Sequence, residues 1–256
     1  MVSKAEFLKA LEEERQSVRG KRVLITGGTT GIGRATALLL AAHDARVLIF
    51  GRHEPELESA MRDLRDMGGE AHGLIADVTS EEDIRRVFAE VDARLGGLDI
   101  LINNAALPAR SVLEDDYAHW EYVVKANLLG YLACSRLAVD RMRANGGGQI
   151  INIGSMSAVK REGGSSLYVA TKSAVQGFTE ALRKEANNDG IRVVLIEPGL
   201  VGTDLNDVPP PKQQEMEADM RMLKAEDIAV CIHFILTEPQ RVDMIVVQVR
   251  PHLQII

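Results

Sequence analysis

The sequence predicts an α/β fold, in which helices cover both faces of a mainly parallel sheet of about seven strands. Short runs rich in Val, Ile and Leu alternate with longer helical stretches along the whole chain. Each run is continuously apolar instead of alternating with polar residues, which is typical of parallel strands buried on both faces. Repeated β–α order implies right-handed crossovers and a doubly wound sheet. A length of 256 residues suits one large domain of this kind.

The expected elements follow one another in a regular order. Strands are expected at residues 22–26, 46–50, 71–76, 98–102, 149–153, 191–196 and 243–249. Helices are expected from the first glycine turn to about residue 43, and then at 54–67, from 80 onward, at about 114–143, at 166–187 and at 225–237. Thr79 or Ser80 can cap the third of these helices, whose first turn carries three acidic residues that suit the helix dipole.

Two segments fall outside this alternation. Residues 1–20 are expected to form an N-terminal helical extension, with a helix over 4–18 that packs Phe7, Leu8, Leu11 and Val18 against the single domain of residues 21–256. Residues 200–222 contain three consecutive prolines and a polar run, which predicts a mobile substrate loop with a short helix. Such a long insertion suits either a lid over a site or a plain surface excursion.

Composition excludes several classes of protein. A net charge of −7 without a basic cluster argues against nucleic acid as a partner. No apolar stretch reaches the ~18 residues of a membrane span, and the first residues lack the apolar core of a signal peptide, so we expect a cytoplasmic protein. Cys134 and Cys231 stand apart in apolar helical stretches and predict two unpaired thiols. The scattered histidines predict no metal site.

A glycine-rich turn, TGGTTGIGR, follows the first expected strand and precedes the first expected helix of the domain. Gly27, Gly31 and Gly33 let the backbone turn tightly and let a pyrophosphate approach the helix N-terminus. The spacing is Gly-x-x-x-Gly-x-Gly, which differs from the commoner Gly-x-Gly-x-x-Gly. The turn predicts a Rossmann-type dinucleotide site, and a purely structural βα turn is the alternative.

The end of the second strand bears on the choice of dinucleotide. Proteins that select NAD place an acid there for the ribose 2′-hydroxyl, whereas an arginine accommodates a 2′-phosphate. Here Phe50 and Gly51 are followed by Arg52, which favours NADP(H) over NAD(H). Glu54 lies close by and weakens this preference, and an exposed loop arginine without a ligand is the alternative.

The next three strands also end in small or polar residues. Asp77 and Val78 follow the third strand, Asn104, Ala105 and Ala106 follow the fourth, and Ser155 follows the fifth. Ligands of open α/β sheets bind at the carboxyl ends of the strands, and small side chains let a cofactor lie close to the backbone. We therefore expect these positions to line one site.

Tyr168 and Lys172 form the pair most informative for chemistry. Residues four apart lie on one face of a helix, so the lysine ammonium would stand beside the phenol. That charge favours the phenolate and is expected to lower a tyrosine pKa that starts near ~10. The pair then predicts an acid/base group, with an ordinary surface pair as the alternative.

Six motifs in one order and spacing carry a resemblance to a known family. TGGTTGIG, NNAA, KANLLG, NIGSMSA, YVATK and EPGLVGT resemble the classical short-chain dehydrogenase/reductases, over nearly the whole chain from about residue 21 to 250. The resemblance implies a catalytic tetrad of Asn127, Ser155, Tyr168 and Lys172. Tyr168 would give its proton to a substrate carbonyl oxygen, Ser155 would orient that oxygen, Lys172 would bind the nicotinamide ribose, and Asn127 would hold a water linked to Lys172.

The same resemblance implies a set of cofactor contacts that runs from the glycine turn to the nicotinamide end. Asp77 and Val78 would flank the adenine, and the segment from Pro198 onward would contact the nicotinamide. The full set is Gly27, Thr29, Thr30, Gly31, Ile32, Gly33, Arg52, Asp77, Val78, Asn104, Ala105, Ala106, Tyr168, Lys172, Pro198, Gly199, Val201 and Thr203.

Some residues depart from the family pattern. Asn-Asn-Ala-Ala replaces Asn-Asn-Ala-Gly, Thr30 stands where some NADP-dependent members carry a basic residue, and the chain ends IVVQVRPHLQII where many members have a Gly-Gly pair. With EPGLVGTDL and TEPQ, this ending resembles NADP-dependent carbonyl and 3-hydroxy-acid reductases of the family.

The resulting hypothesis is an oxidoreductase that transfers a hydride between NADP(H) and a carbonyl or secondary alcohol of a small molecule. An epimerase or dehydratase on the same scaffold, or an NADP(H)-binding regulator, is the alternative. The substrate pocket is expected among residues 106–116, 156–165 and 200–222, with Pro108, Met156, Val159, Leu205 and Met216 as apolar candidates. The resemblance also implies a homotetramer or dimer that forms through helices 114–143 and 166–187.

Overall fold

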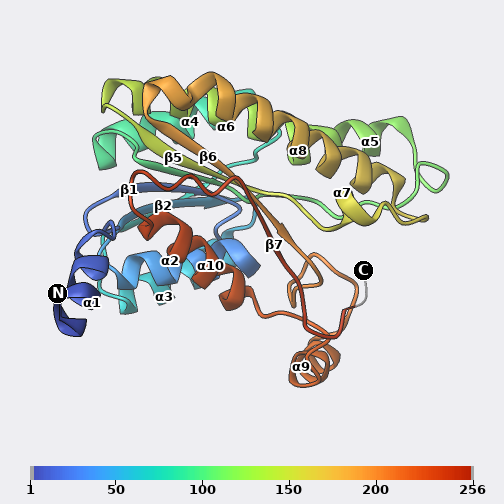
Figure 1. Cartoon of the computed structure of the whole chain (residues 1–256). Helices are drawn as coiled ribbons and strands as arrows, with labels where there is room; N and C mark the ends of the chain where they lie inside the picture. The colour runs from blue at the N-terminus through green and yellow to red at the C-terminus, as the bar shows by residue number, and fades with distance from the viewer. Residues whose placement is uncertain (1–2, 255–256) are drawn as a thin grey trace.

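The computed structural model describes residues 3–254, and over these residues it confirms the α/β prediction. They form one seven-stranded sheet of order β3-β2-β1-β4-β5-β6-β7, in which each neighbouring pair is parallel (Figure 1). The strands are β1 (Arg22–Thr26), β2 (Arg46–Gly51), β3 (Ala71–Ile75), β4 (Ile100–Asn103), β5 (Gly148–Ile153), β6 (Ile191–Pro198) and β7 (Val246–Val249). The strand order reverses between β1 and β4, which is where doubly wound sheets bind ligands.

Helices cover both faces of this sheet, as Figure 1 shows. One layer holds α2 (Gly31–Ala42), α3 (Glu54–Asp66) and α10 (Ala225–Thr237). The other holds α4 (Glu81–Glu90), α5 (Tyr117–Val124), α6 (Gly130–Ala144) and α8 (Ser166–Ala186). The shorter elements are α1 (Lys4–Glu13), η1 (Val91–Leu95), η2 (Lys125–Leu129), α7 (Ser157–Lys160), η3 (Asn187–Asp189) and α9 (Pro210–Ala218).

The two helical layers explain why the strands are apolar throughout. In β1, Val23 and Ile25 belong to the core beneath α2 and α10, whereas Leu24 belongs to the core on the opposite face. All three side chains are fully buried. Because successive side chains of a strand point to opposite faces, a strand covered on both sides needs apolar residues at every position.

Most predicted boundaries agree with the structure to within three residues. The strand expected at 98–102 begins later, at Ile100, because Asp99 pairs with Arg22 instead. The Arg22 backbone nitrogen and Nε each donate to Asp99 Oδ2 over 2.9 Å, and Nη2 donates to Oδ1 over 2.6 Å. The helix expected at 114–143 begins at Tyr117, where Asp116 caps it, and a π-helical turn divides it into α5 and α6.

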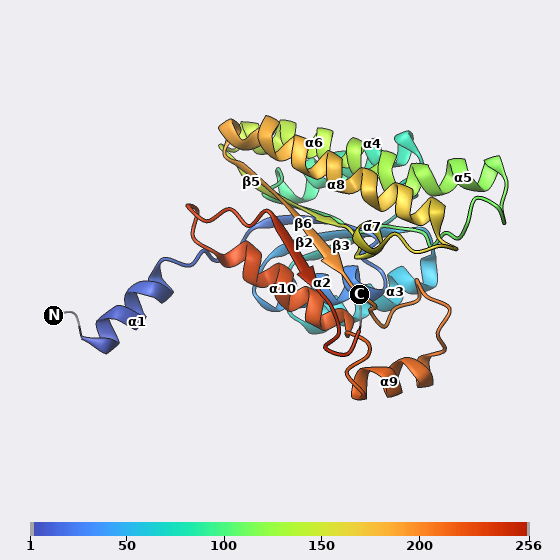
Figure 2. The same cartoon turned by 45° about the vertical axis from the view of Figure 1, so that its right-hand side comes forward.

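The N-terminal expectation is partly wrong. Helix α1 ends at Glu13 instead of continuing to residue 18, and Figure 2 shows it pointing away from the body of the protein. Phe7 is 55 % exposed, so it does not pack on the domain, whereas Val18 lies beyond the helix and is buried in the core beneath α2. The side chains of Leu8 and Leu11 lie outside the described part of the structure. The division of the chain at residue 20 stays a prediction.

The segment 200–222 does contain a short helix, α9. The two ends of this segment are held to each other, because Leu223 N donates to Leu200 O over 2.9 Å and Gly202 N donates to Leu223 O over 2.8 Å. The two cysteines are free thiols as predicted, with Cys134 buried and Cys231 partly buried. Within residues 3–254, none of the helices has the length and apolar character needed to cross a membrane.

Candidate active site

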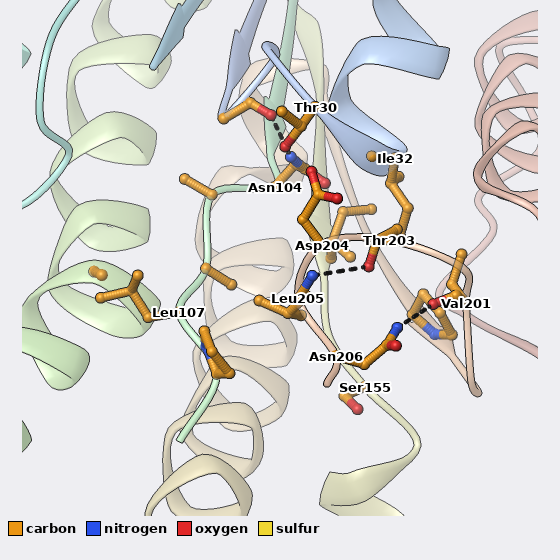
Figure 3. A pocket seen from close by; sticks show the side chains of 18 of the residues that line it. Thr30, Ile32, Asn104, Leu107, Ser155, Val201, Thr203, Asp204, Leu205 and Asn206 are labelled. Atoms are coloured by element: carbon orange, nitrogen blue, oxygen red, sulfur yellow. Dashed lines mark hydrogen bonds between the residues drawn. The ribbon is translucent and has the colours of Figure 1, made fainter. Parts of the chain in front are cut away.

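A cavity of about 730 Å³ opens at the carboxyl edge of the sheet, where the strand order reverses. Figure 3 shows it between the glycine turn, the segment after β4 and the segment after β6. Most of the predicted site residues line it: Gly27, Thr29, Thr30, Gly31, Ile32, Arg52, Asp77, Val78, Asn104, Ala105, Ala106, Ser155, Tyr168, Lys172, Pro198, Gly199, Val201 and Thr203. The other two predicted site residues, Gly33 and Asn127, do not line the cavity.

The glycine turn is built without room for side chains. Gly27 has a φ of +62°, and a Cβ there would lie 2.9 Å from the Cα of Ala105. A Cβ on Gly33 would lie 2.2 Å from the carbonyl oxygen of Gly27. Gly33 therefore packs the start of α2 against the turn, and this shapes the cavity although Gly33 does not line it.

Polar contacts tie this turn to the end of β4. The Thr26 hydroxyl accepts from the backbone nitrogens of Asn104 and Ala105, each over 2.9 Å. The Asn104 side-chain amide donates to the carbonyl oxygens of Thr26 and Gly27, each over 3.0 Å. The backbone at the start of α2 thus faces the cavity in a fixed conformation, which suits the pyrophosphate of a dinucleotide.

Arg52 lines the end of the cavity that is expected to hold adenosine. Its guanidinium donates to the Tyr122 hydroxyl and stands 5.7 Å from the centre of the Tyr122 ring. The same hydroxyl donates to Asp77 Oδ2 over 3.1 Å. Glu56 also lines this end, and among the described residues its buried Oε2 has no hydrogen-bond partner. Both a cation and an unsatisfied carboxylate thus line this end of the cavity.

Tyr168, Lys172 and Ser155 come together at the opposite end of the cavity. The Lys172 ammonium stands 5.8 Å from the centre of the Tyr168 ring, and Ser155 hydrogen-bonds the Tyr168 phenol. Lys172 is only 1 % exposed, and its Nζ donates to the carbonyl oxygen of Ile153 over 2.9 Å. Tyr131, a buried residue of α6, donates to the same carbonyl oxygen over 3.1 Å.

The expected pKa of Tyr168 is wrong in direction. Burial raises the pKa of its phenol, and the Ser155 hydrogen bond, which lowers that pKa, does not outweigh burial. Burial also lowers the pKa of Lys172 to about 7. The ammonium is therefore only partly charged near neutral pH, which weakens the effect on Tyr168 that helical spacing alone suggests. Tyr168 stays a protonated phenol and is suited to donating a proton.

Asn127 lies in the π-helical turn η2 and is fully buried. Its Oδ1 accepts from Leu107 N over 2.7 Å, and its Nδ2 donates to Leu107 O over 2.9 Å. The side chain is therefore committed to the backbone that follows β4 and fixes one wall of the cavity. π-Helical turns within α-helices are frequent at functional sites.

Only some of the apolar residues expected in the substrate pocket line the cavity. Pro108, Met156 and Leu205 line the cavity as expected. The other two are corrections: Val159 is 45 % exposed on α7, and Met216 lies on α9, away from the lining. Their positions depend on how the two loops turn, which residue type does not reveal.

Sequence reasoning missed several residues of the lining, among them Tyr122, Glu56 and Gln254. Lys160, Asp204 and Asn206 also contribute to it, and they fall within the ranges expected for the substrate pocket. Glu56 follows the end of β2 by a few residues, so its place in the chain is a usable signal. Tyr122 and Gln254 offered no such signal, since one lies within a helix and the other lies beyond the last strand. In the described part of the chain, no cluster of three or more His, Cys, Asp or Glu could hold a metal.

A family model described as short chain dehydrogenase matches residues 21–214, which is more than half of the chain. The chain belongs to the short-chain dehydrogenase family. This short-chain dehydrogenase is 32 % identical to an uncharacterised oxidoreductase of Staphylococcus aureus over 232 residues, which cover 90 % of this chain and 97 % of the relative. It is 37 % identical to carbonyl reductase family member 4 of Danio rerio over 188 residues, which cover 71 % of this chain and 76 % of the relative.

Solved structures agree with this assignment. L-sorbose reductase of Gluconobacter frateurii, in complex with NADPH and L-sorbose, matches this short-chain dehydrogenase with a TM-score of 0.84 at 27 % identity, covering 92 % of this chain and 97 % of that chain. The protein is therefore an oxidoreductase of a family that uses NAD(P). The glycine turn leaves no room for a Cβ and borders a cavity of about 730 Å³, and both features fit such a dinucleotide.

Proposed function

We propose that the protein reduces a small-molecule carbonyl to a secondary alcohol with NADPH, and catalyses the reverse reaction with NADP⁺. The supporting observation is the convergence of Tyr168, Ser155 and Lys172 at one end of a cavity whose middle is the glycine turn. The carbonyl reductase and sorbose reductase similarities support the same class of reaction.

Each of these residues has a distinct part in the proposed reaction. The nicotinamide supplies a hydride to the carbonyl carbon when it is bound. Tyr168 gives its phenolic proton to the carbonyl oxygen, so that a C–H and an O–H bond form as the C=O double bond is lost. Ser155 donates a hydrogen bond to the same oxygen and keeps it within reach of Tyr168. Lys172 has N–H groups beyond the one that Ile153 accepts, and these are available to the ribose.

The raised pKa of Tyr168 supports its role as the proton donor in reduction near neutral pH. A group that must donate a proton works only in its protonated form, and burial keeps the phenol protonated. Oxidation needs the phenolate and is therefore expected to speed up toward alkaline pH.

A cofactor preference for NADP(H) is part of the proposal. Arg52 supports it, because the guanidinium lines the adenosine end and is able to pair with a 2′-phosphate. Glu56 acts in the opposite sense, since its carboxylate suits a ribose 2′-hydroxyl and repels a phosphate. We propose that Arg52 outweighs Glu56. The Arg52 side chain is exposed, so exchanging its contact with Tyr122 for one with the phosphate costs little.

Two substitutions test this preference. Arg52→Ala is expected to weaken NADPH binding about tenfold or more and to leave NADH binding within twofold, since a charge-assisted hydrogen bond contributes ~1.5–3 kcal/mol. Glu56→Gln is expected to strengthen NADPH binding. Both are measured by fluorescence titration of the reduced cofactors, and equal losses for NADPH and NADH in Arg52→Ala would contradict the assignment.

The reaction itself is tested with a panel of aliphatic, cyclic and keto-acid ketones, by following NADPH absorbance. Tyr168→Phe is expected to abolish turnover while NADPH still binds, because only the proton donor is lost. Tyr117→Phe is the matched control, since Tyr117 is 75 % exposed and stands outside the cavity. Turnover that survives in Tyr168→Phe would refute the assignment of the acid. An epimerase or dehydratase would convert substrate without net loss of NADPH.

A homo-oligomer, either tetramer or dimer, also stays a proposal. Leu129, the last residue of η2, and Leu132, in the first turn of α6, are 51 % and 38 % exposed, which supports a contact through this helical layer. Light scattering coupled to gel filtration measures the mass directly, and a monomer at micromolar concentration would refute the proposal. The cytoplasmic location stays a prediction.

A further inference from the structure

The last residues of the described chain return to the cavity. After β7 ends at Val249, residues 250–254 turn back toward the segment 200–222 (Figures 1 and 2). Pro251 is buried, and the partly buried Gln254 lines the cavity together with Gly199 and Leu200. This ending is where the sequence departs most from the family pattern, and the proposed reaction assigns no role to it.

Two hydrogen bonds join the returning segment to the rest of the protein, and a third lies within it. Gln254 Oε1 accepts from the backbone nitrogen of Leu200 over 3.1 Å. Leu253 N donates to Met220 O over 3.0 Å, which links the segment to the far end of the loop. Arg250 Nη1 donates to the Gln254 carbonyl oxygen over 2.5 Å and closes the tail on itself. The side chain of Gln254 is thereby held in a defined place.

Gln254 packs directly on the backbone of the turn after β6. A Cβ on Gly199 would lie 2.2 Å from Gln254 Oε1, so only glycine allows this approach. The preceding residues are fixed from the other side: the buried Glu197 carboxylate accepts from Gln176 over 2.5 Å and from Gln248 over 2.9 Å. Backbone hydrogen bonds hold other groups of this turn, because Gly199 N donates to Val249 O over 2.7 Å and Leu200 O accepts from Leu223 N over 2.9 Å. Gln254 supplies the hydrogen-bond partner of Leu200 N.

We propose that Gln254 is a positioning residue, whose side-chain oxygen holds the Gly199–Leu200 turn in place at the nicotinamide end of the cavity. This proposal rests on the proposed function, because the turn matters to the reaction only if a nicotinamide lies against it. Without this hydrogen bond, the backbone nitrogen of Leu200 loses its partner and the turn samples other positions, which costs turnover because reactants must be held in a narrow geometry.

The test compares Gln254→Ala with Gln254→Glu in the full-length protein, because glutamate keeps an oxygen that accepts from Leu200 N. Gln254→Ala is expected to lower kcat about tenfold and to weaken NADPH binding about three- to tenfold, in line with one lost hydrogen bond. For Gln254→Glu, both kcat and the affinity for NADPH are expected to stay within about threefold of wild type. His252→Ala is the matched control, since His252 is an exposed residue of the same segment.

Amide hydrogen exchange over residues 199–205 tests the positioning role without cofactor or substrate. Faster exchange in Gln254→Ala than in His252→Ala and Gln254→Glu, at unchanged melting temperature, supports the proposal. Equal exchange in all three variants, or an equal loss of kcat in Gln254→Glu and Gln254→Ala, would overturn it. If the wild-type protein fails to oxidise NADPH with any ketone, the proposed function fails, while the exchange experiment still decides whether Gln254 holds the turn.

Discussion

Lys172 is predicted to lower the free energy of unfolding, although the proposed reaction needs it. Its side chain is fully buried, and burial lowers its pKa from 10.5 to about 7. At ~1.36 kcal/mol per pKa unit, this fall corresponds to a cost of about 5 kcal/mol for keeping the proton on the folded protein. Lys172→Met removes the cost and fills a similar volume. It forfeits the hydrogen bond to Ile153, worth ~1 kcal/mol, but Tyr131 still donates to that carbonyl oxygen.

We therefore expect Lys172→Met to raise the free energy of unfolding by about 3 kcal/mol at pH 7 while turnover falls at least ~100-fold. Between pH 7 and 10.5 the unfolded chain keeps the Lys172 proton and the folded chain releases it. The unfolded state binds more protons in this window, so wild-type stability rises with pH there. The variant lacks this rise, and its advantage is expected to shrink by about 2–3 kcal/mol between pH 6 and 9.

Urea unfolding followed by circular dichroism at pH 6, 7, 8 and 9 measures this difference. Tyr131 and Tyr168, whose pKa values are raised by burial, stay protonated in both folded proteins between pH 6 and 9, so they add little to the pH dependence of the difference. Lys184→Met is the matched control on the same helix, because Lys184 is 61 % exposed, and it is expected to change stability little at any pH. A variant less stable than wild type at pH 6, or an advantage that does not vary with pH, would refute this account of Lys172.

Three further substitutions test the fold and the glycine turn. Gly33→Ala would place a methyl group 2.2 Å from the Gly27 carbonyl oxygen, so it is expected to cost ~1–3 kcal/mol in thermal unfolding and to weaken NADPH binding at least tenfold by calorimetry. Unchanged NADPH affinity would show that the turn does not cradle the cofactor. Gly177→Ala lies in the middle of α8, and no atom beyond the adjoining residues and backbone of the same helix lies within 4 Å of the new methyl group. This substitution is expected to stabilise the protein by ~0.5–1 kcal/mol. Asp99→Asn is expected to cost ~1–3 kcal/mol at pH 7, because it weakens the pairing with Arg22. Burial raises the Asp99 pKa, but the Arg22 hydrogen bonds outweigh burial and hold the pKa below its ordinary value of 3.8. The stabilisation is therefore present above pH ~4 and is lost as pH falls through the folded-state pKa, so an equal cost at pH 7 and pH 2.5 would contradict the assignment.

The sequence by itself determined the sheet and the ends of its strands. A strand covered on both faces must be apolar at every position. This pattern predicted the ends of β1, β2, β5 and β6 to within two residues. Helical spacing placed Tyr168 and Lys172 on one face of α8, and both line the cavity. These features are local, because they depend on the periodicity of a few consecutive residues.

Only the tertiary structure decided how these residues behave. The pKa of Tyr168 rises instead of falling, because desolvation depends on every element packed around the phenol and also weakens the charge of Lys172. Tyr122 reaches Arg52 and Asp77 from a helix that follows a different strand. Gln254 reaches Leu200 from beyond the last strand. Contacts between segments so far apart in the chain produce no periodic pattern in the sequence. They depend on the conformations of the loops, which residue type alone does not determine.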